Sequence, residues 1–131
     1  MQYSFEDAVE TILAHHPEYT AEAYSFMRQA LDVATEQFHK ESSSPHLSAE
    51  ELYLGACAYA LDEYGPLARL VLARWGIATS EDVGAIVYNL IEVGVFGKQE
   101  GDSPEQFDGL RSLAEILDAP YLLPESPDPQ A

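Results

Sequence analysis

Four histidines and a single cysteine are the residues of this chain best suited to binding a metal ion. His15 and His16 are adjacent, so on a helix they point about 100° apart and cannot easily face one ion. His46 stands four residues before Glu50, and these two are weak candidates for a polar site. No spacing matches a zinc motif, so we expect neither a metal nor another cofactor.

Nucleophilic catalysis has little support in the sequence. Cys57 lies in the most apolar stretch of the chain, where burial raises a thiol pKa and makes the group unreactive. The serines at 42–44 have no recognisable partner, and the sequence has no phosphate-binding glycine loop. The sequence favours a protein without enzymatic activity. The alternative is an enzyme or small-ligand-binding protein with a pocket near His46 and Glu50.

Aromatic residues give the strongest indication of a binding surface. Tyrosine and tryptophan combine a large apolar body with a polar group, and they are enriched where a core meets a partner. The alternative is that these residues line the edge of the core, with their hydroxyls in water. Our candidate interaction surface consists of Tyr53, Tyr59, Tyr64, Trp75, Tyr88 and Asn89.

Residues 66–93 resemble a helix-turn-helix, with a turn at Trp75-Gly76 and a second helix that begins at Thr79 or Ser80. Three acidic residues and no Lys or Arg lie on the expected outward face of that helix, where they would repel phosphate. That face comprises Glu81, Asp82, Ala85, Tyr88, Asn89 and Glu92. We therefore expect a scaffold; a winged-helix-like nucleic-acid binder is the alternative.

Net charge points to the kind of partner. The chain carries 23 acidic and six basic residues, with a formal net charge of −17. Such a surface repels nucleic acids and anionic membranes, and it attracts basic partners. It could also act as an acidic nucleic-acid mimic, or serve solubility alone. We predict a protein-interaction module with an acidic helical surface that binds a protein partner, a basic one in particular, or associates with itself.

Helices are the elements predicted to position these residues. A capping box at Ser4 opens a short helix that ends at Pro17, and an apolar stripe from 24 to 38 predicts a long amphipathic helix. Ser48 opens a helix through Tyr64 that is apolar on nearly every side, so it must lie centrally or face another subunit. Gly55 within it is expected where another backbone passes close by.

The second half continues in the same way. Further helices are predicted at 66–75, from Ser80 to a C-cap near Gly94, and from Ser103 to 117. A short extended or hairpin element is predicted near 95–101. We therefore expect an all-α single compact domain of about six helices over residues 1–119. Residues 120–131 are rich in proline and acids and are predicted to form a disordered tail.

Three features predict a soluble cytoplasmic protein. The single cysteine allows no intramolecular disulfide, and the first ten residues carry acids but no basic residue. No apolar run approaches the ~20 residues of a membrane span.

One set of residues in and around the span 46–94 carries a resemblance to known proteins. The set is His46, Glu51-Leu52, Gly55, Tyr64-Gly65, Trp75-Gly76, Asp82, Gly84 and Gly94, with Tyr24-Ser25-Phe26 before them and Asp102-Ser103 and Phe107 after. With these features the chain resembles a family of small conserved hypothetical proteins typical of planctomycetes and verrucomicrobia. That family has no assigned activity, so the resemblance implies a bacterial source and transfers no catalytic residue.

Overall fold

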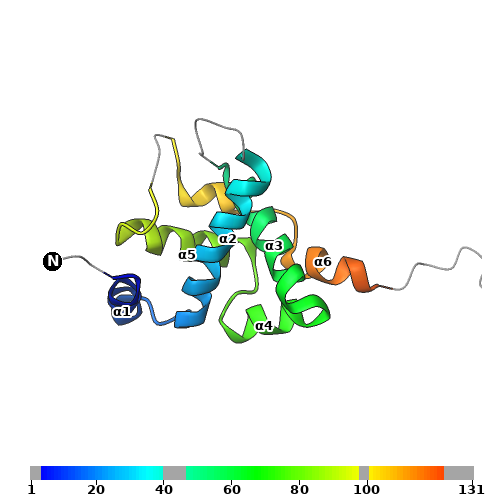
Figure 1. Cartoon of the computed structure of the whole chain (residues 1–131), viewed down its shortest axis with the longest axis horizontal. Helices are drawn as coiled ribbons and strands as arrows, with labels where there is room; N and C mark the ends of the chain where they lie inside the picture. Colours follow the sequence, from blue (N-terminus) through cyan, green and yellow to red (C-terminus); the bar gives the residue numbers. More distant parts are fainter. Residues whose placement is uncertain (1–3, 40–46, 98–100, 123–131) are drawn as a thin grey trace, which may run out of the picture.

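A computed structural model describes residues 4–39, 47–97 and 101–122 (Figure 1). Within these ranges the chain forms six α-helices, three short 3₁₀ helices and no strand, which confirms the predicted all-α fold. The elements in chain order are α1 (Phe5–His15), α2 (Ala21–His39), α3 (Ala49–Tyr64), η1 (Gly65–Leu67), α4 (Ala68–Arg74), α5 (Ser80–Glu92), η2 (Pro104–Phe107), α6 (Leu113–Asp118) and η3 (Ala119–Tyr121).

Capping boxes set the starts of α3 and α5. The Ser48 hydroxyl accepts a hydrogen bond from the Glu51 amide at 3.0 Å, and the Glu51 carboxylate accepts one from the Ser48 amide. Thr79 and Asp82 repeat this arrangement at the start of α5. Both pairs satisfy N–H groups that the first turn of a helix leaves unpaired, so the helix boundaries are fixed locally.

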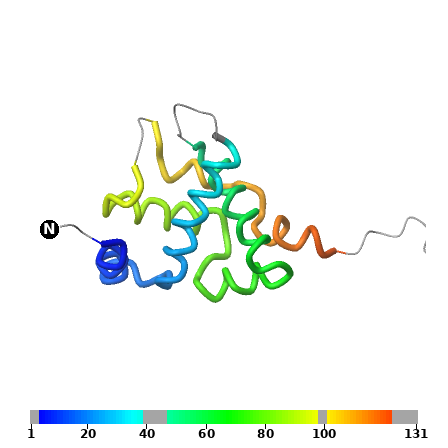
Figure 2. The backbone as a smooth tube through the Cα atoms, viewed as in Figure 1, coloured from blue at the N-terminus to red at the C-terminus, as the bar shows by residue number. Residues whose placement is uncertain are grey.

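Helix α3 occupies the centre of the fold, as its apolar sequence predicts. It packs most extensively on α2, which runs beside it, and it also contacts α4, α5, α6, η1 and η2 (Figures 1 and 2). Gly55 allows the close approach to α2, because a Cβ at Gly55 would overlap the Ala34 Cβ and lie 3.0 Å from the Ala34 Cα. The predicted close backbone at Gly55 is confirmed.

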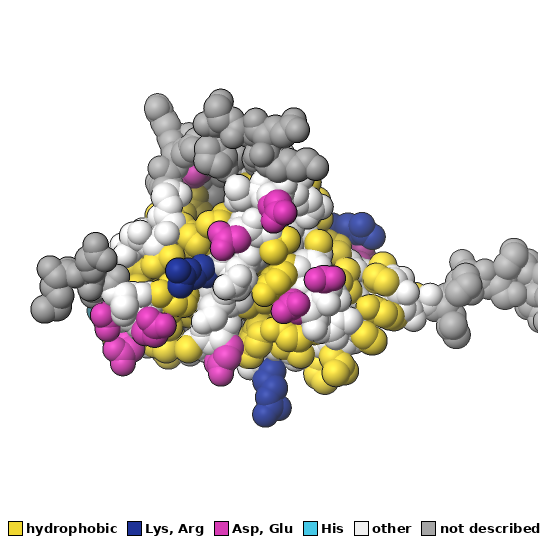
Figure 3. Space-filling view, viewed as in Figure 1, with side chains coloured by type: hydrophobic (Ala, Val, Ile, Leu, Met, Phe, Trp, Pro, Cys, Tyr) yellow, Lys and Arg dark blue, Asp and Glu magenta, His cyan; other side chains and the backbone are white. Residues whose placement is uncertain are grey.

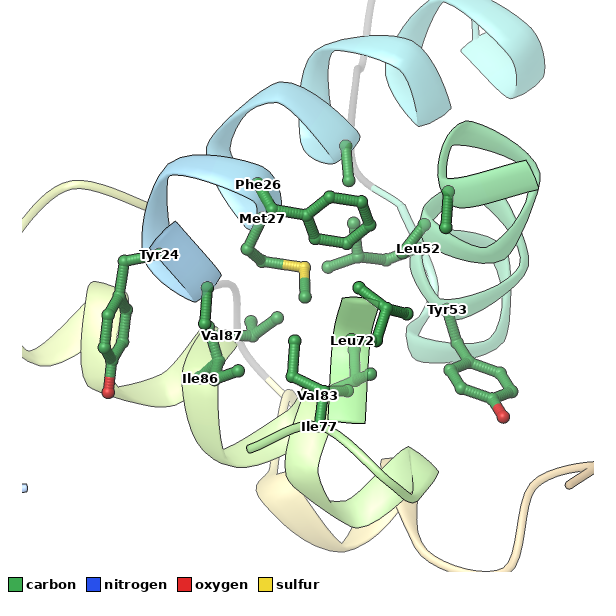
Figure 4. Close-up of a cluster of buried hydrophobic side chains, with 14 of the residues drawn as sticks. Tyr24, Phe26, Met27, Leu52, Tyr53, Leu72, Ile77, Val83, Ile86 and Val87 are labelled. Atoms are coloured by element: carbon green, nitrogen blue, oxygen red, sulfur yellow. The ribbon is translucent and has the colours of Figure 1, made fainter. Parts of the chain in front are cut away.

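The core combines side chains from α2, α3, α4, α5 and the turn before α5. Met27, Leu72 and Ile86 are fully buried at its centre. Figure 4 shows Tyr24 and Tyr53 on two sides of this cluster, with both hydroxyl groups pointing away from the centre. Each hydroxyl has a partner: Tyr24 accepts from Asn89 Nδ2 at 3.0 Å, and Tyr53 donates to the Arg111 carbonyl at 2.6 Å.

The predicted single helix from Ser103 to 117 is wrong, because the chain breaks it into η2 and α6. Gly109 has a φ of +68°, which a right-handed helix does not allow. Its amide donates to Glu81 Oε2 at 3.2 Å, so a bond to α5 replaces a bond within the helix. The Ser112 hydroxyl then accepts from the Glu115 amide at 3.4 Å and starts α6 afresh.

The predicted extended element near 95–101 is absent from its described part. The amides of Val95 and Phe96 both donate to the Leu90 carbonyl, at 2.9 and 3.3 Å, which folds the chain back over the end of α5 and buries Phe96. Residues 98–100 of that prediction lie outside the described residues. The tail predicted from 120 starts too early, because Pro120 and Tyr121 belong to η3, and its remainder at 123–131 also lies outside the described residues.

Two buried tyrosine hydroxyls and a buried thiol predict that the fold loses stability at alkaline pH. Burial raises the pKa of Cys57 to about 12 and also raises the pKa of Tyr53 and of Tyr19, which donates to Asp82. The ordinary values are 9.0 for the thiol and 10.0 for tyrosine, so the unfolded chain releases these protons first. Their stabilising contribution is therefore complete below pH 9 and declines as the pH rises toward 12.

We expect urea titrations to show a free energy of unfolding that falls above pH ~9, by up to about 1.4 kcal/mol per pH unit for each titrating group. Cys57→Ala removes one such group and is expected to flatten the decline between the thiol's ordinary pKa and about 12. A free energy of unfolding that stays constant up to pH ~11 would contradict this assignment.

Candidate functional site

Three of the predicted surface aromatics form one cluster around a buried ring from α2. Phe26 lies with its centroid 5.4 Å from Tyr59 and 5.8 Å from Trp75. Tyr64 meets Trp75 edge to face at 5.7 Å, with an interplanar angle of 83°. The rings of Tyr59, Tyr64 and Trp75 are half-buried, so this cluster packs α2 against α3 and the end of α4 and presents its edges to solvent.

The other three predicted residues lie elsewhere. Tyr53 is 1% exposed and belongs to the core, so its prediction as a surface residue is wrong; its hydroxyl reaches a carbonyl rather than water. Asn89 is half-buried and donates to Tyr24, which ties α5 to α2. Tyr88 lines a pocket described below. The six predicted residues therefore do not form one continuous surface.

Helix α5 does not have the free outward face expected of it. It packs against α1, α2, α3 and η2. Asp82 accepts a hydrogen bond from the Tyr19 hydroxyl at 2.7 Å and is half-buried. Of the six residues predicted to face outward, only Glu81 and Glu92 are exposed, and both are acidic. The helix is therefore held on several sides, and its exposed positions carry the wrong charge for a nucleic-acid groove.

The weak polar-site candidates do not converge in the part of the chain that is described. Glu50 is exposed and does not line the pocket between α2, α3 and α5 that is described below, and His46 lies outside the described residues. Across residues 4–39, 47–97 and 101–122, no group of three or more His, Cys, Asp or Glu side chains could hold a metal ion. In the same ranges, no helix is long and apolar enough to cross a membrane.

An exposed apolar patch on η1, α4 and η3 is a feature that the sequence interpretation missed. We define the α4 patch as Leu67, Leu70, Tyr121 and Leu122, which are 59%, 68%, 47% and 68% exposed. Figure 3 shows hydrophobic side chains gathered on the lower right of the molecule, where α4 and α6 lie. A Cβ at Gly65 would lie 3.6 Å from the Tyr121 hydroxyl, so η3 lies next to η1.

Polar contacts hold the elements of the α4 patch together. Arg69 Nε donates to Asp118 Oδ1 at 3.1 Å and joins α4 to α6. On α4, Ala68 and Leu72 are buried against the core, whereas Leu70 of α4 and Leu67 of η1 are exposed. The sequence "PLARLVLARW" is apolar on both sides of this short helix, so it gives no signal as to which leucines face the core.

A pocket of about 470 Å³ lies between α2, α3, α5 and the segment around η2. Its walls are mostly apolar, and Tyr88 and Asp102 add polar groups to the lining. Leu47, Ser48 and Ala49 also line it, so it lies beside the position at which the sequence suggested a ligand pocket. Glu50, the described residue of that suggestion, is exposed and does not belong to the lining.

Comparisons with protein-family models, with curated proteins and with solved structures gave no significant match to this chain. The resemblance to the planctomycete and verrucomicrobial family therefore stays a prediction.

Proposed function

We propose that this protein is a non-enzymatic interaction module that binds a basic protein partner through the α4 patch. The observation that carries the proposal is the exposure of Leu67 at the end of η1 and of Leu70 in the first turn of α4, at 59% and 68%. Folded monomers bury most large aliphatic side chains, and a contiguous apolar patch with a polar rim is typical of a protein contact site. Tyr121 adds an aromatic side chain of the kind that anchors interfaces.

Charge supports a different protein, rather than a second copy, as the partner. Two copies would each bring a net charge of −17 to the contact, and their repulsion opposes association. Asp62 and Glu63 are exposed at the end of α3, immediately before η1, and add acidic groups beside the patch. A partner with apolar side chains surrounded by Lys and Arg complements this surface, and its association would slow as salt rises.

We also propose a cytoplasmic location. Cys57 is 1% exposed and has no second cysteine in the chain to pair with, which suits a reducing compartment.

Replacing both leucines tests the interaction. Leu67→Ser with Leu70→Ser is expected to leave the free energy of unfolding within about 0.5 kcal/mol, because surface substitutions rarely change it more. Affinity capture from the source cells, quantified by mass spectrometry, should recover a basic protein with the unaltered chain and lose it with this variant. The captured protein, once purified, should bind the unaltered chain more weakly as salt rises, because charge steers the association.

Leu54→Ser is the matched control, since Leu54 is also exposed, at 37%, but lies on α3 outside the patch. It should retain the partner. Equal recovery by the Leu67→Ser, Leu70→Ser variant and the unaltered chain would contradict the proposal. If analytical ultracentrifugation shows that the unaltered chain is a dimer and that the Leu67→Ser, Leu70→Ser variant is a monomer, then a second copy of the chain binds the α4 patch instead.

A further inference from the structure

The pocket beside η2 has a volume that is usual for a small-ligand site. Its volume of about 470 Å³ falls in the range of ~300–1,000 Å³ that is usual for such sites. Leu31 of α2, Leu52 of α3, Val87 of α5 and Phe107 of η2 contribute apolar walls. Because Leu52, Val87 and Phe107 are themselves buried in the core, this wall is held in place by packing rather than formed on binding.

Polar groups at the pocket give it a negative electrostatic character. Asp102 belongs to the lining, and Glu105 lies nearby on η2. Burial first, and then the charges of Asp102 and Glu105, raise the pKa of Tyr88. The Gln106 side chain is occupied by the Ser103 amide and the Gly101 carbonyl. The other polar side chains of the lining are those of Thr35, Ser48, Tyr88 and Asp102.

From this geometry we infer a binding site for a small molecule with an apolar body and a protonated amine at one end. The apolar body would fill the space between α2, α3 and α5, and the amine would lie toward Asp102, Glu105 and the Tyr88 ring. Carboxylates attract an ammonium group, and the face of an aromatic ring adds to that attraction. The same charges disfavour a fatty acid or another carboxylate of equal length. This site is separate from the α4 patch and does not rest on its proposed function.

Three probes that differ only in their end group test the inference with the full chain. Phenylbutylamine, phenylbutanol and 5-phenylpentanoate share one apolar body, a phenyl ring on four methylene groups, and their binding can be followed by ¹H–¹⁵N NMR titration. We expect the amine to bind in the high micromolar to low millimolar range, as befits so small a ligand. The alcohol should bind more weakly, and the carboxylate at least about tenfold more weakly than the amine, because both carboxylates repel it. Shifted amides should cluster around Tyr88 and Phe107.

Two variants separate the charge from the cavity. Asp102→Asn with Glu105→Gln is expected to reduce the preference for the amine over the carboxylate to less than about threefold, since it removes the charges without changing size. Gly97→Leu is expected to weaken all three probes, because Gly97 lines the pocket and a Cβ there meets no atom within 4 Å. Glu115 is exposed on α6, so Glu115→Gln serves as the control and should leave the affinities for all three probes unchanged.

Absence of binding by the amine at millimolar concentration would overturn the inference. So would a carboxylate that binds as tightly as the amine, or an affinity for the amine that Gly97→Leu leaves unchanged. None of these three results bears on the α4 patch, because Leu67 and Leu70 do not line this pocket.

Discussion

Gly55→Val is expected to lower the free energy of unfolding by about 3 kcal/mol, because it inserts three carbon atoms where α2 and α3 touch. Even the first of them would overlap the Ala34 Cβ and lie 3.0 Å from the Ala34 Cα, which is backbone and cannot rotate away. The two helices would have to separate, and α3 contacts most of the other elements. Urea denaturation followed by circular dichroism measures the change.

A swap of the two small residues tests whether the contact itself is the cause. Gly55→Ala alone brings a gain of ~1 kcal/mol in helix propensity, yet we expect it to destabilise the fold, since the clash outweighs that gain. Adding Ala34→Gly should recover stability, with a coupling energy of at least about 1 kcal/mol in the double-mutant cycle. Gly97→Ala, at an open position, should have little effect. Additive effects of the Gly55 and Ala34 changes would show that the two residues do not press on each other.

Asp82→Ala is also expected to lower the free energy of unfolding by about 3 kcal/mol, because the Asp82 carboxylate both caps α5 and accepts a tertiary hydrogen bond. Its Oδ2 accepts from the amides of Ala78 and Thr79, at 2.8 and 3.1 Å, at the start of α5. Its Oδ1 accepts from the hydroxyl of Tyr19, which is buried and precedes α2. Removing the carboxylate loses the capping box and leaves a buried hydroxyl without its acceptor. Thermal and urea unfolding both report the loss.

The control for Asp82 is Asp7, which occupies the same position in the capping box of α1. Asp7 Oδ2 accepts from the Ser4 amide at 3.4 Å, at an exposed site. Asp7→Ala is therefore expected to lower the free energy of unfolding by only about 1 kcal/mol or less, which is the usual contribution of a helix cap. Tyr19→Phe should recover part of the Asp82→Ala loss when the two are combined, since it removes the unpaired hydroxyl. Equal effects of Asp7→Ala and Asp82→Ala would argue against a tertiary role for Asp82.

The structure changes which residues we assign to the protein-interaction surface. Sequence reasoning selected tyrosines, tryptophan and one asparagine as the contact residues. In the fold, Tyr53 is buried and Asn89 donates a hydrogen bond to Tyr24, while the side chains of the α4 patch are exposed instead. The proposed class of function is unchanged, but its residues are different ones. The pocket adds a second testable site whose wall no sequence pattern indicated.

Short-range features of this chain could be read from the sequence because their physics is local. Ser48 and Glu51 lie three residues apart, so their mutual hydrogen bonds form within a single turn and fix the start of α3. The same holds for Thr79 and Asp82 at α5. The all-α class follows from such caps together with apolar residues at helical spacing.

Other features depended on partners far away in the sequence. The break between η2 and α6 rests on Glu81 and Gly109, which are 28 positions apart, and the burial of Tyr53 rests on the Arg111 carbonyl, 58 positions away. The outward orientation of Leu67 and Leu70 depends on which side of α4 the neighbouring helices cover. The sequence by itself thus determined helices α1 to α5 and where they begin. Only the tertiary structure decided the break between η2 and α6 and which apolar side chains are buried, because both depend on where distant segments pack.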